Sequence, residues 1–230
     1  MTLRIAIIPA RGNSKRIKNK NIKIFNGKPI IKYSLENTKK SKLFSKIHVS
    51  TESKKISKIV GNKYIDFFRP KKLSKDKTPT FKVLKFVVNE YIKNKIKFDE
   101  IWCINACSPL IKISDLEKAS KVLKKNPNNI IISVSSFNVP IEWSFKKNKK
   151  DKLEPLFPGA YKKNSQNFKK KYFDTGDFIC MNYKIFKNIN IKSNLDKLYH
   201  GVEIEKFRSV DIDEIEDWKI AELFYKGLKI

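Results

Sequence analysis

"LRIAIIPARGNSKRIKNKN" (residues 3–21) begins as an apolar run and passes without a break into a polar, cationic loop. The apolar part, residues 4–9, has the length and composition of a buried β-strand. The loop after it holds one glycine, several small polar residues and a cluster of cations. In an open parallel sheet, ligands bind beyond the carboxyl ends of the strands, where this loop would lie. We therefore expect an α/β fold with a binding site at the end of the first strand.

The rest of the chain alternates short apolar runs with longer amphipathic stretches. The apolar runs predict strands at residues 46–50, 64–68, 100–105, 130–135 and 178–182. The amphipathic stretches predict helices at residues 29–41, 53–61, 80–94, 114–125 and 215–228. Ser114 is expected to N-cap its helix with Glu117 completing a capping box, and the last helix is expected to dock on the sheet. This alternation predicts a mostly parallel sheet covered by helices on both faces, which is a three-layer α/β fold.

A stretch of irregular sequence interrupts this alternation at about residues 137–175. Prolines, lysines and polar residues replace the regular pattern there. An excursion of this length inside a compact domain is usually functional or serves oligomerisation. Because no linker or internal repeat is evident, we expect residues 1–230 to form a single domain that includes this excursion.

The chain is strongly basic, with 51 Lys and Arg against 23 Asp and Glu, a formal net charge of +28. Such a charge is typical of proteins that bind nucleic acid through phosphate contacts. The lysines are spread along the whole chain, mostly on predicted helix faces and loops, which favours a solvated basic surface instead. Nucleic-acid binding therefore stays the alternative. Only five of the cations are arginines: Arg4, Arg11, Arg16, Arg69 and Arg208.

The sequence also indicates where the protein works. No apolar run approaches the ~18 residues that a membrane-spanning helix needs, and the N-terminal apolar run is too short for a secretory leader. The three cysteines are an odd number without CxxC spacing. Free thiols of this kind are typical of a reducing compartment, so we expect a cytoplasmic protein without membrane contacts.

The loop after the first strand has the composition of an anion site. Backbone N–H groups around residues 12–14 can point at an anion, and Arg11, Lys15, Arg16 and Lys20 add positive charge. Neither the GxxxxGK[ST] pattern nor GxGxxG is present. A plain surface turn is the alternative, but this cation cluster directly after a buried strand favours a polyphosphate.

A second constellation lies near the end, in "FRSVDIDEIEDW" (residues 207–218). Asp211 and Asp213 are two residues apart, so in extended backbone their side chains project to the same side. Magnesium commonly binds one or two carboxylates together with phosphate oxygens of a substrate. The alternative is that Asp213 only caps the last helix. Two carboxylates beside an arginine favour a Mg²⁺ site.

These motifs together resemble the CMP-sialic acid synthetase (acylneuraminate cytidylyltransferase) family. "IPARGNSKR" (residues 8–16) with "KNI" (20–22) is similar to the family pattern IPARGGSKRxxxKNI, and other landmarks follow in the same order: "GKPIIKYSLE" (27–36), "VST" (49–51), "FFRPKKLSKDKT" (67–78) and "VDIDEIEDW" (210–218). The middle of the chain is most similar to pseudaminic acid cytidylyltransferases, through "SVSSFNVPIEWSF" (133–145), "NSQNF" (164–168) and "YFDTGDFICMN" (172–182). Asn13 stands where the family usually has Gly, and Asp177 where the pseudaminate branch has Gln.

The resemblance implies a Rossmann-like nucleotidyltransferase fold, a homodimer, and a reaction. The anomeric hydroxyl of a nonulosonic acid attacks the α-phosphate of CTP and gives CMP-sugar and pyrophosphate. The nucleotide would be held by Ala10, Arg11, Gly12, Asn13, Ser14, Arg16, Lys20, Asn21, Arg69 (beside cytosine), Asp76 and Thr78. Asp211 and Asp213 would hold Mg²⁺, with Arg11, Lys20 and Asp211 acting in catalysis, and Asn105, Ser165 and Gln166 would face the sugar.

Pseudaminic acid is the expected sugar. N-acetylneuraminic acid, legionaminic acid and a sugar 1-phosphate are the alternatives to it.

Overall fold

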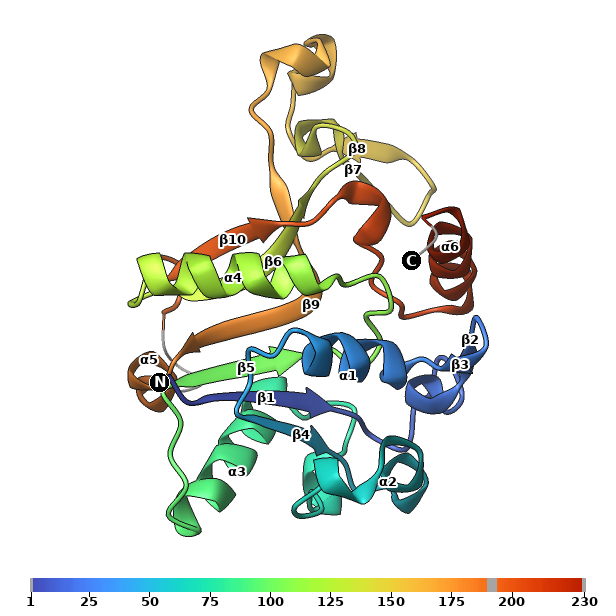
Figure 1. Cartoon of the computed structure of the whole chain (residues 1–230). Helices are drawn as coiled ribbons and strands as arrows, with labels where there is room; N and C mark the ends of the chain where they lie inside the picture. Colours follow the sequence, from blue (N-terminus) through green and yellow to red (C-terminus); the bar gives the residue numbers. More distant parts are fainter. Residues whose placement is uncertain (1, 190–193, 229–230) are drawn as a thin grey trace.

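The computed structural model describes residues 2–189 and 194–228 and contains one central sheet of six strands. Its strand order is β10 (Tyr199–Glu203), β6 (Ile130–Ser136), β9 (Tyr172–Asn182), β5 (Glu100–Ile104), β1 (Arg4–Pro9) and β4 (Lys46–Ser50). β1 is parallel to both β4 and β5, and β10 is parallel to β6. Only β9 runs antiparallel, between β5 and β6 (Figure 1). The predicted mostly parallel sheet is therefore confirmed.

Helices cover both faces of this sheet, which makes the three layers predicted from the sequence. On one face, α1 (Ile31–Lys40), α2 (Lys54–Val60) and α4 (Ile113–Lys125) pack on the even-numbered residues of β1. On the other face, α3 (Thr80–Lys93) and α5 (Tyr183–Asn188) pack on the odd-numbered residues of β1. Both faces of β1 are apolar because both are buried, which explains its continuous hydrophobic run.

The last helix, α6 (Ile215–Gly227), does not dock on the sheet as expected. Its Trp218 packs at right angles to Phe25 in the small hairpin of β2 (Ile24–Phe25) and β3 (Lys28–Pro29). Tyr33 of α1 completes this separate cluster, and its hydroxyl donates to the Phe25 carbonyl at 2.7 Å. Phe25 of the hairpin and Tyr33 of α1 therefore provide a docking surface that helical periodicity alone does not reveal.

Two further predictions were wrong in detail. Residues 64–68 form no strand, because the apolar side chains there pack outside the edge strand β4 and Phe67 lies against His48 with ring centroids 4.5 Å apart. Ser114 does not cap α4: the helix begins at Ile113, and the Asp115 carboxylate accepts the Lys112 N–H at 2.8 Å. Short 3-10 helices occupy the connections: Lys20–Ile22, Asn62–Tyr64, Lys71–Leu73, Ile141–Trp143, Ala160–Lys162, Ser165–Asn167 and Lys206–Arg208.

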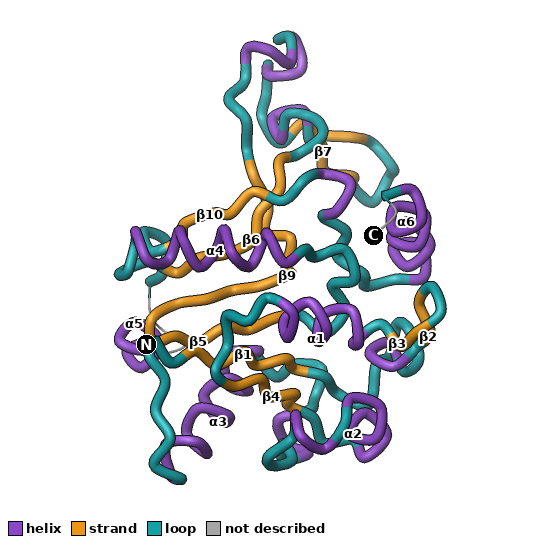
Figure 2. The backbone as a smooth tube through the Cα atoms, viewed as in Figure 1, coloured by secondary structure: helices purple, strands orange, loops and turns teal. Residues whose placement is uncertain are grey.

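The irregular excursion forms an arm that projects from the sheet beyond β6 and returns through β9 (Figures 1 and 2). It holds the hairpin of β7 (Phe145–Lys147) and β8 (Leu153–Pro155) and a few aromatic contacts, such as Trp143 against Tyr161. Several of its large apolar side chains are exposed, among them Leu153, Leu156 and Phe157. Among the described residues, no helix is long and apolar enough to cross a membrane.

Candidate active site

The loop after β1 is held in place by the strand beside it. Ala10 is fully buried, and its N–H donates to the Ser50 carbonyl of β4 at 2.9 Å. Gly12 then passes so close to the next loop that a Cβ there would lie 2.9 Å from the Ser53 Cβ, so only glycine fits without a shift. Over the described part of the chain, no acceptor lies against the N–H groups of Asn13 and Ser14, which leaves them free for an anion.

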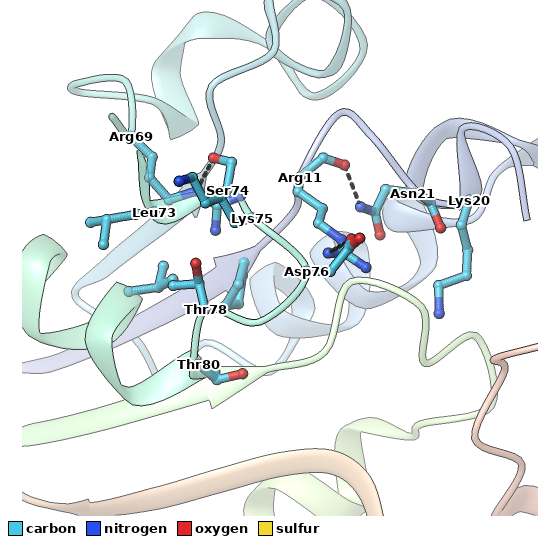
Figure 3. A pocket seen from close by; sticks show the side chains of 13 residues that line it. Arg11, Lys20, Asn21, Arg69, Leu73, Ser74, Lys75, Asp76, Thr78 and Thr80 are labelled. Atoms are coloured by element: carbon cyan, nitrogen blue, oxygen red, sulfur yellow. Dashed lines mark hydrogen bonds and ion pairs between the residues drawn. The ribbon is translucent and has the colours of Figure 1, made fainter. Parts of the chain in front are cut away.

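A cavity of about 260 Å³ opens between this loop and residues 69–80 (Figure 3). Seven of the residues predicted to hold nucleotide line it: Arg11, Ser14, Lys20, Asn21, Arg69, Asp76 and Thr78. The other four do not line the cavity. Ala10 is buried in the core, and Gly12 packs against Glu52 and Ser53. Asn13 is exposed, and Arg16 pairs with Asp213. The residues therefore come together from two loops far apart in the sequence.

The cations of this loop form ion pairs with two carboxylates, those of Asp76 and Asp213. Asp76 pairs with Arg11 (Figure 3). It also pairs with Lys15, whose Nζ lies 2.9 Å from its carboxylate. Hydrogen bonding from Lys15, and then the charge of Arg11, holds the pKa of Asp76 below its usual range. Asp213 Oδ1 likewise lies 2.8 Å from Arg16 Nη2 and 3.2 Å from Lys20 Nζ. A triphosphate entering the cavity would replace the aspartates as the ion-pair partner of these cations, because it carries more negative charge than the two aspartates together.

Arg69 lies in the wall of the cavity with only 4% of its side chain exposed. Its Nη2 is 3.0 Å from a carboxylate oxygen of Glu52, and its Nε donates to the Ser74 hydroxyl at 3.1 Å. Glu52 is a residue that sequence reasoning missed. Its position directly after "VST" (49–51), at the end of the strand next to β1, is the signal that could have found it.

The aspartate pair lies between the last 3-10 helix and α6. The capping alternative is wrong, because Asp217 accepts the N–H groups of Asp213 and Glu214, at 3.0 and 2.7 Å. Partial burial, and then the charge of Asp213, raises the pKa of Asp211. Two carboxylates that repel each other in this way fit a divalent cation. Among the described residues, His, Cys, Asp and Glu form no metal-binding group of three or more, so a cation here would need further oxygens from a substrate.

Lys20 connects the cavity to the aspartate pair. Its ammonium donates to the Ile212 carbonyl at 2.5 Å and to Asp213, while its stem lines the cavity. At the next residue, Asn21, the side-chain oxygen Oδ1 accepts a hydrogen bond from the buried Cys107 thiol at 3.1 Å. Burial raises the pKa of Cys107 to about 12, so this thiol stays protonated and serves as a structural donor.

A second hollow of about 310 Å³ adjoins the first and shares Pro9 and Thr80 with it. Asn105, at the end of β5, lines this hollow together with Asp174 and Gly176. Ser165 and Gln166, which were expected to face the same sugar, line a different hollow on the arm. One chain therefore places Asn105 next to the cavity beyond β1 but does not bring Ser165 and Gln166 to it.

Comparisons with known proteins place the chain in a family. The family model described as Cytidylyltransferase matches residues 5–230. The chain is 31% identical to a pseudaminic acid cytidylyltransferase of Campylobacter jejuni subsp. jejuni serotype O:2 over 96% of both chains. It is 26% identical to an N-acylneuraminate cytidylyltransferase of Escherichia coli O18:K1:H7, over 94% of this chain and 51% of that one.

Solved structures show the same fold. A CMP:2-keto-3-deoxy-manno-octonic acid synthetase complexed with CTP superposes with a TM-score of 0.71 at 13% identity, over 100% of both chains. A 4-diphosphocytidyl-2C-methyl-D-erythritol synthase from Anaerococcus prevotii gives a TM-score of 0.61 at 13% identity, over 98% of this chain and 99% of that one. The predicted Rossmann-like nucleotidyltransferase fold is thereby confirmed. From its match to the family model over nearly its full length, the chain belongs to the cytidylyltransferase family.

Proposed function

We propose that this protein transfers CMP from CTP to a nonulosonic acid, with pseudaminic acid as its substrate. The observation that carries this proposal is the cavity beyond β1, which is lined by Arg11 and Lys20 and adjoins the hollow at Asn105. An anionic donor and a polyhydroxylated acceptor would thus lie side by side. The choice of pseudaminic acid is supported by the 31% identity to the Campylobacter jejuni enzyme over nearly the whole chain.

In the proposed reaction, the anomeric hydroxyl of the sugar acid gives up its proton to water, and its oxygen bonds to the α-phosphorus of CTP while the bond from that phosphorus to the oxygen shared with the β-phosphate breaks. Pyrophosphate leaves with the negative charge that develops on that oxygen. Arg11, Lys20 and the N–H groups of Asn13 and Ser14 would neutralise this charge from fixed positions, which is how preorganised donors lower such a barrier. Asp76 and Asp213 release these cations when the triphosphate arrives.

We also propose that Asp211 and Asp213 hold Mg²⁺. A bound Mg²⁺ would neutralise phosphate oxygens and orient the triphosphate. The raised pKa of Asp211, which comes first from burial and then from the charge of Asp213, is consistent with this assignment. Lys20 contacts Asp213 and also lines the cavity, so the aspartate pair lies next to the proposed nucleotide site.

The arm supports a homodimer as a further part of the proposal. It exposes Leu153, Leu156 and Phe157 to solvent and carries Ser165 and Gln166 away from the sugar hollow of its own chain. In a homodimer the arm would bury these apolar side chains and could bring its two polar residues to the partner. Sedimentation should then give twice the mass of one chain. The three free, buried cysteines agree with a cytoplasmic setting.

The experiment that tests the proposal compares acceptors. Pyrophosphate release from CTP and Mg²⁺ is measured with pseudaminic, legionaminic and N-acetylneuraminic acids and with a sugar 1-phosphate. Release with pseudaminic acid at the highest kcat/KM is expected. A higher value with another acid would overturn the choice of sugar, and release only with the sugar 1-phosphate would overturn the acceptor class. Salt-sensitive binding to random DNA without any turnover would instead favour the nucleic-acid alternative.

A further inference from the structure

Glu52 connects the two walls of the nucleotide cavity through a single carboxylate. Its Oε1 accepts the Gly12 N–H at 2.6 Å, on the loop after β1. Its Oε2 accepts the Ser74 hydroxyl at 2.7 Å and an Arg69 N–H at 3.0 Å, both on the opposite wall. Arg69 and Ser74 also bind each other, so the three side chains form a closed set of hydrogen bonds.

The peptide group between Arg11 and Gly12 is held from both of its ends. Its carbonyl accepts the Asn21 amide at 2.8 Å, and its N–H is the one that Glu52 binds. With both ends fixed, this peptide plane cannot rotate. The orientation of the plane fixes ψ of Arg11 and φ of Gly12, and so sets the direction in which the loop continues from Arg11 toward Asn13 and Ser14.

Electrostatics make an ionised Glu52 suitable for this position. Burial alone would raise the pKa of Glu52, but the hydrogen bonds from Ser74, Gly12 and Arg69 outweigh burial and lower it. Glu52 is therefore a carboxylate at neutral pH. A free carboxylate beside a triphosphate would repel it, but Arg69 lies against this one and neutralises its charge. The charge of Arg69 thus serves the wall of the cavity rather than the phosphates.

We propose that Glu52 is a positioning residue for CTP, which locks the Arg11–Gly12 peptide and fixes the loop after β1 against residues 69–74. Glu52 does not line the cavity and acts through Gly12, Arg69 and Ser74. Misplacement of a binding group by about 1 Å can cost on the order of 10²-fold in rate. The consequences of losing Glu52 should therefore fall on the nucleotide and not on the sugar acid, which binds in the hollow at Asn105.

The test uses Glu52→Ala, Glu52→Gln and a matched control, Glu36→Gln, on the full chain. Glu36 lies on α1 and pairs with Lys28, away from the cavity. Glu52→Ala should weaken CTP binding by calorimetry at least about tenfold and raise the KM for CTP, with the KM for pseudaminic acid changed less than about twofold. Glu52→Gln, whose amide oxygen can still accept the Gly12 N–H, should recover part of the loss. Glu36→Gln should match the wild type.

A second readout does not depend on activity or on a stable alanine variant. The chain has only seven glycines, so a ¹⁵N-glycine spectrum has few peaks, and Gly12 can be assigned by substitution. A hydrogen bond to a carboxylate should shift the Gly12 amide downfield and slow its exchange, and Glu52→Gln should reduce both effects.

This inference rests on the CTP-binding part of the proposed function, and the outcomes separate the two. A wild type that binds no CTP refutes both. A wild type that binds CTP, with unchanged CTP affinity in a folded Glu52→Ala variant, refutes the role of Glu52 alone. A Gly12 amide that is identical in the wild type and Glu52→Gln refutes the lock on the peptide.

Discussion

Replacing Arg208 by methionine should destabilise the protein strongly, because it leaves a buried carboxylate without its partner. The Arg208 and Asp115 side chains are only 4% and 8% exposed. Their two hydrogen bonds, of 2.5 and 2.9 Å, form a bidentate pair, and Arg208 also donates to the Leu110 carbonyl at 3.1 Å. Methionine keeps the volume of the stem and removes the charge, so the change breaks the buried pair with Asp115 together with the Leu110 hydrogen bond and a half-exposed pair with Glu205 at 2.6 Å.

The expected magnitude follows from this burial. Breaking a buried ion pair by removing one partner costs about 3–5 kcal/mol, mostly because the remaining charge is uncompensated. For a protein of this size, each kcal/mol lowers Tm by about 2–4 °C, so Arg208→Met should lower Tm by about 6–20 °C. The double variant Arg208→Met/Asp115→Asn removes the stranded charge, while the amide oxygen that replaces the carboxylate can still accept the Lys112 N–H. It should recover at least half of the loss.

Urea unfolding of Arg208→Met, Asp115→Asn and the double variant measures the coupling free energy between the two side chains directly. Lys170→Met breaks an exposed ion pair with Glu203 and serves as the control, with an unchanged midpoint expected. Because Arg208 anchors the chain three residues before Asp211, the variant should also need more Mg²⁺ for half-maximal activity. A loss of less than about 1 kcal/mol in Arg208→Met, or a double variant as unstable as the sum of the singles, would refute the reasoning.

Three other predictions concern single side chains. Asp211→Ala should abolish turnover and keep a normal melting curve, and near-normal activity at saturating Mg²⁺ would remove Asp211 from the metal site. Arg11→Ala should weaken CTP binding and slow turnover without unfolding the protein, and calorimetry with unchanged affinity would contradict this. Asp177→Asn should stabilise the protein at pH 7.5, because burial raises the pKa of Asp177 to about 6 and ionising it in the folded state is unfavourable. The unfolded pKa is about 3.9, so the gain, about 2–3 kcal/mol by melting, should shrink as the pH falls from 6 to 4, and a pH-independent difference would be inconsistent with it.

The sequence predicted those parts of the fold whose signal is local. β1 and β5 were predicted to within a residue of their bounds, because strands buried on both faces have nearly continuous apolar runs. The bounds of the edge strand β4 were also predicted. β10 was missed because only Val202 in it is buried, so neither alternation nor a run is visible. Residues 64–68 have the composition of a strand, but their side chains pack beyond the sheet edge, which is a tertiary effect.

The candidate site was predictable where motif and position coincide and not where the fold joins distant segments. Arg11 and Lys20 lie in one motif directly after β1, so their place at the cavity followed from topology. Glu52 could not be identified as the link between two walls, because its partners Gly12 and Ser74 lie 40 and 22 residues away. Where Ser165 and Gln166 lie depends on the course of an irregular arm, which periodicity does not determine.

The most direct test of the central claim is the identity of the product. The wild-type protein is incubated with CTP, Mg²⁺ and pseudaminic acid, and the mixture is analysed by mass spectrometry together with a pyrophosphate assay. The account predicts a CMP-linked nonulosonic acid and pyrophosphate in equal amounts. Folded protein that hydrolyses CTP without forming a CMP-sugar, or that gives no product with any nonulosonic acid, would contradict it.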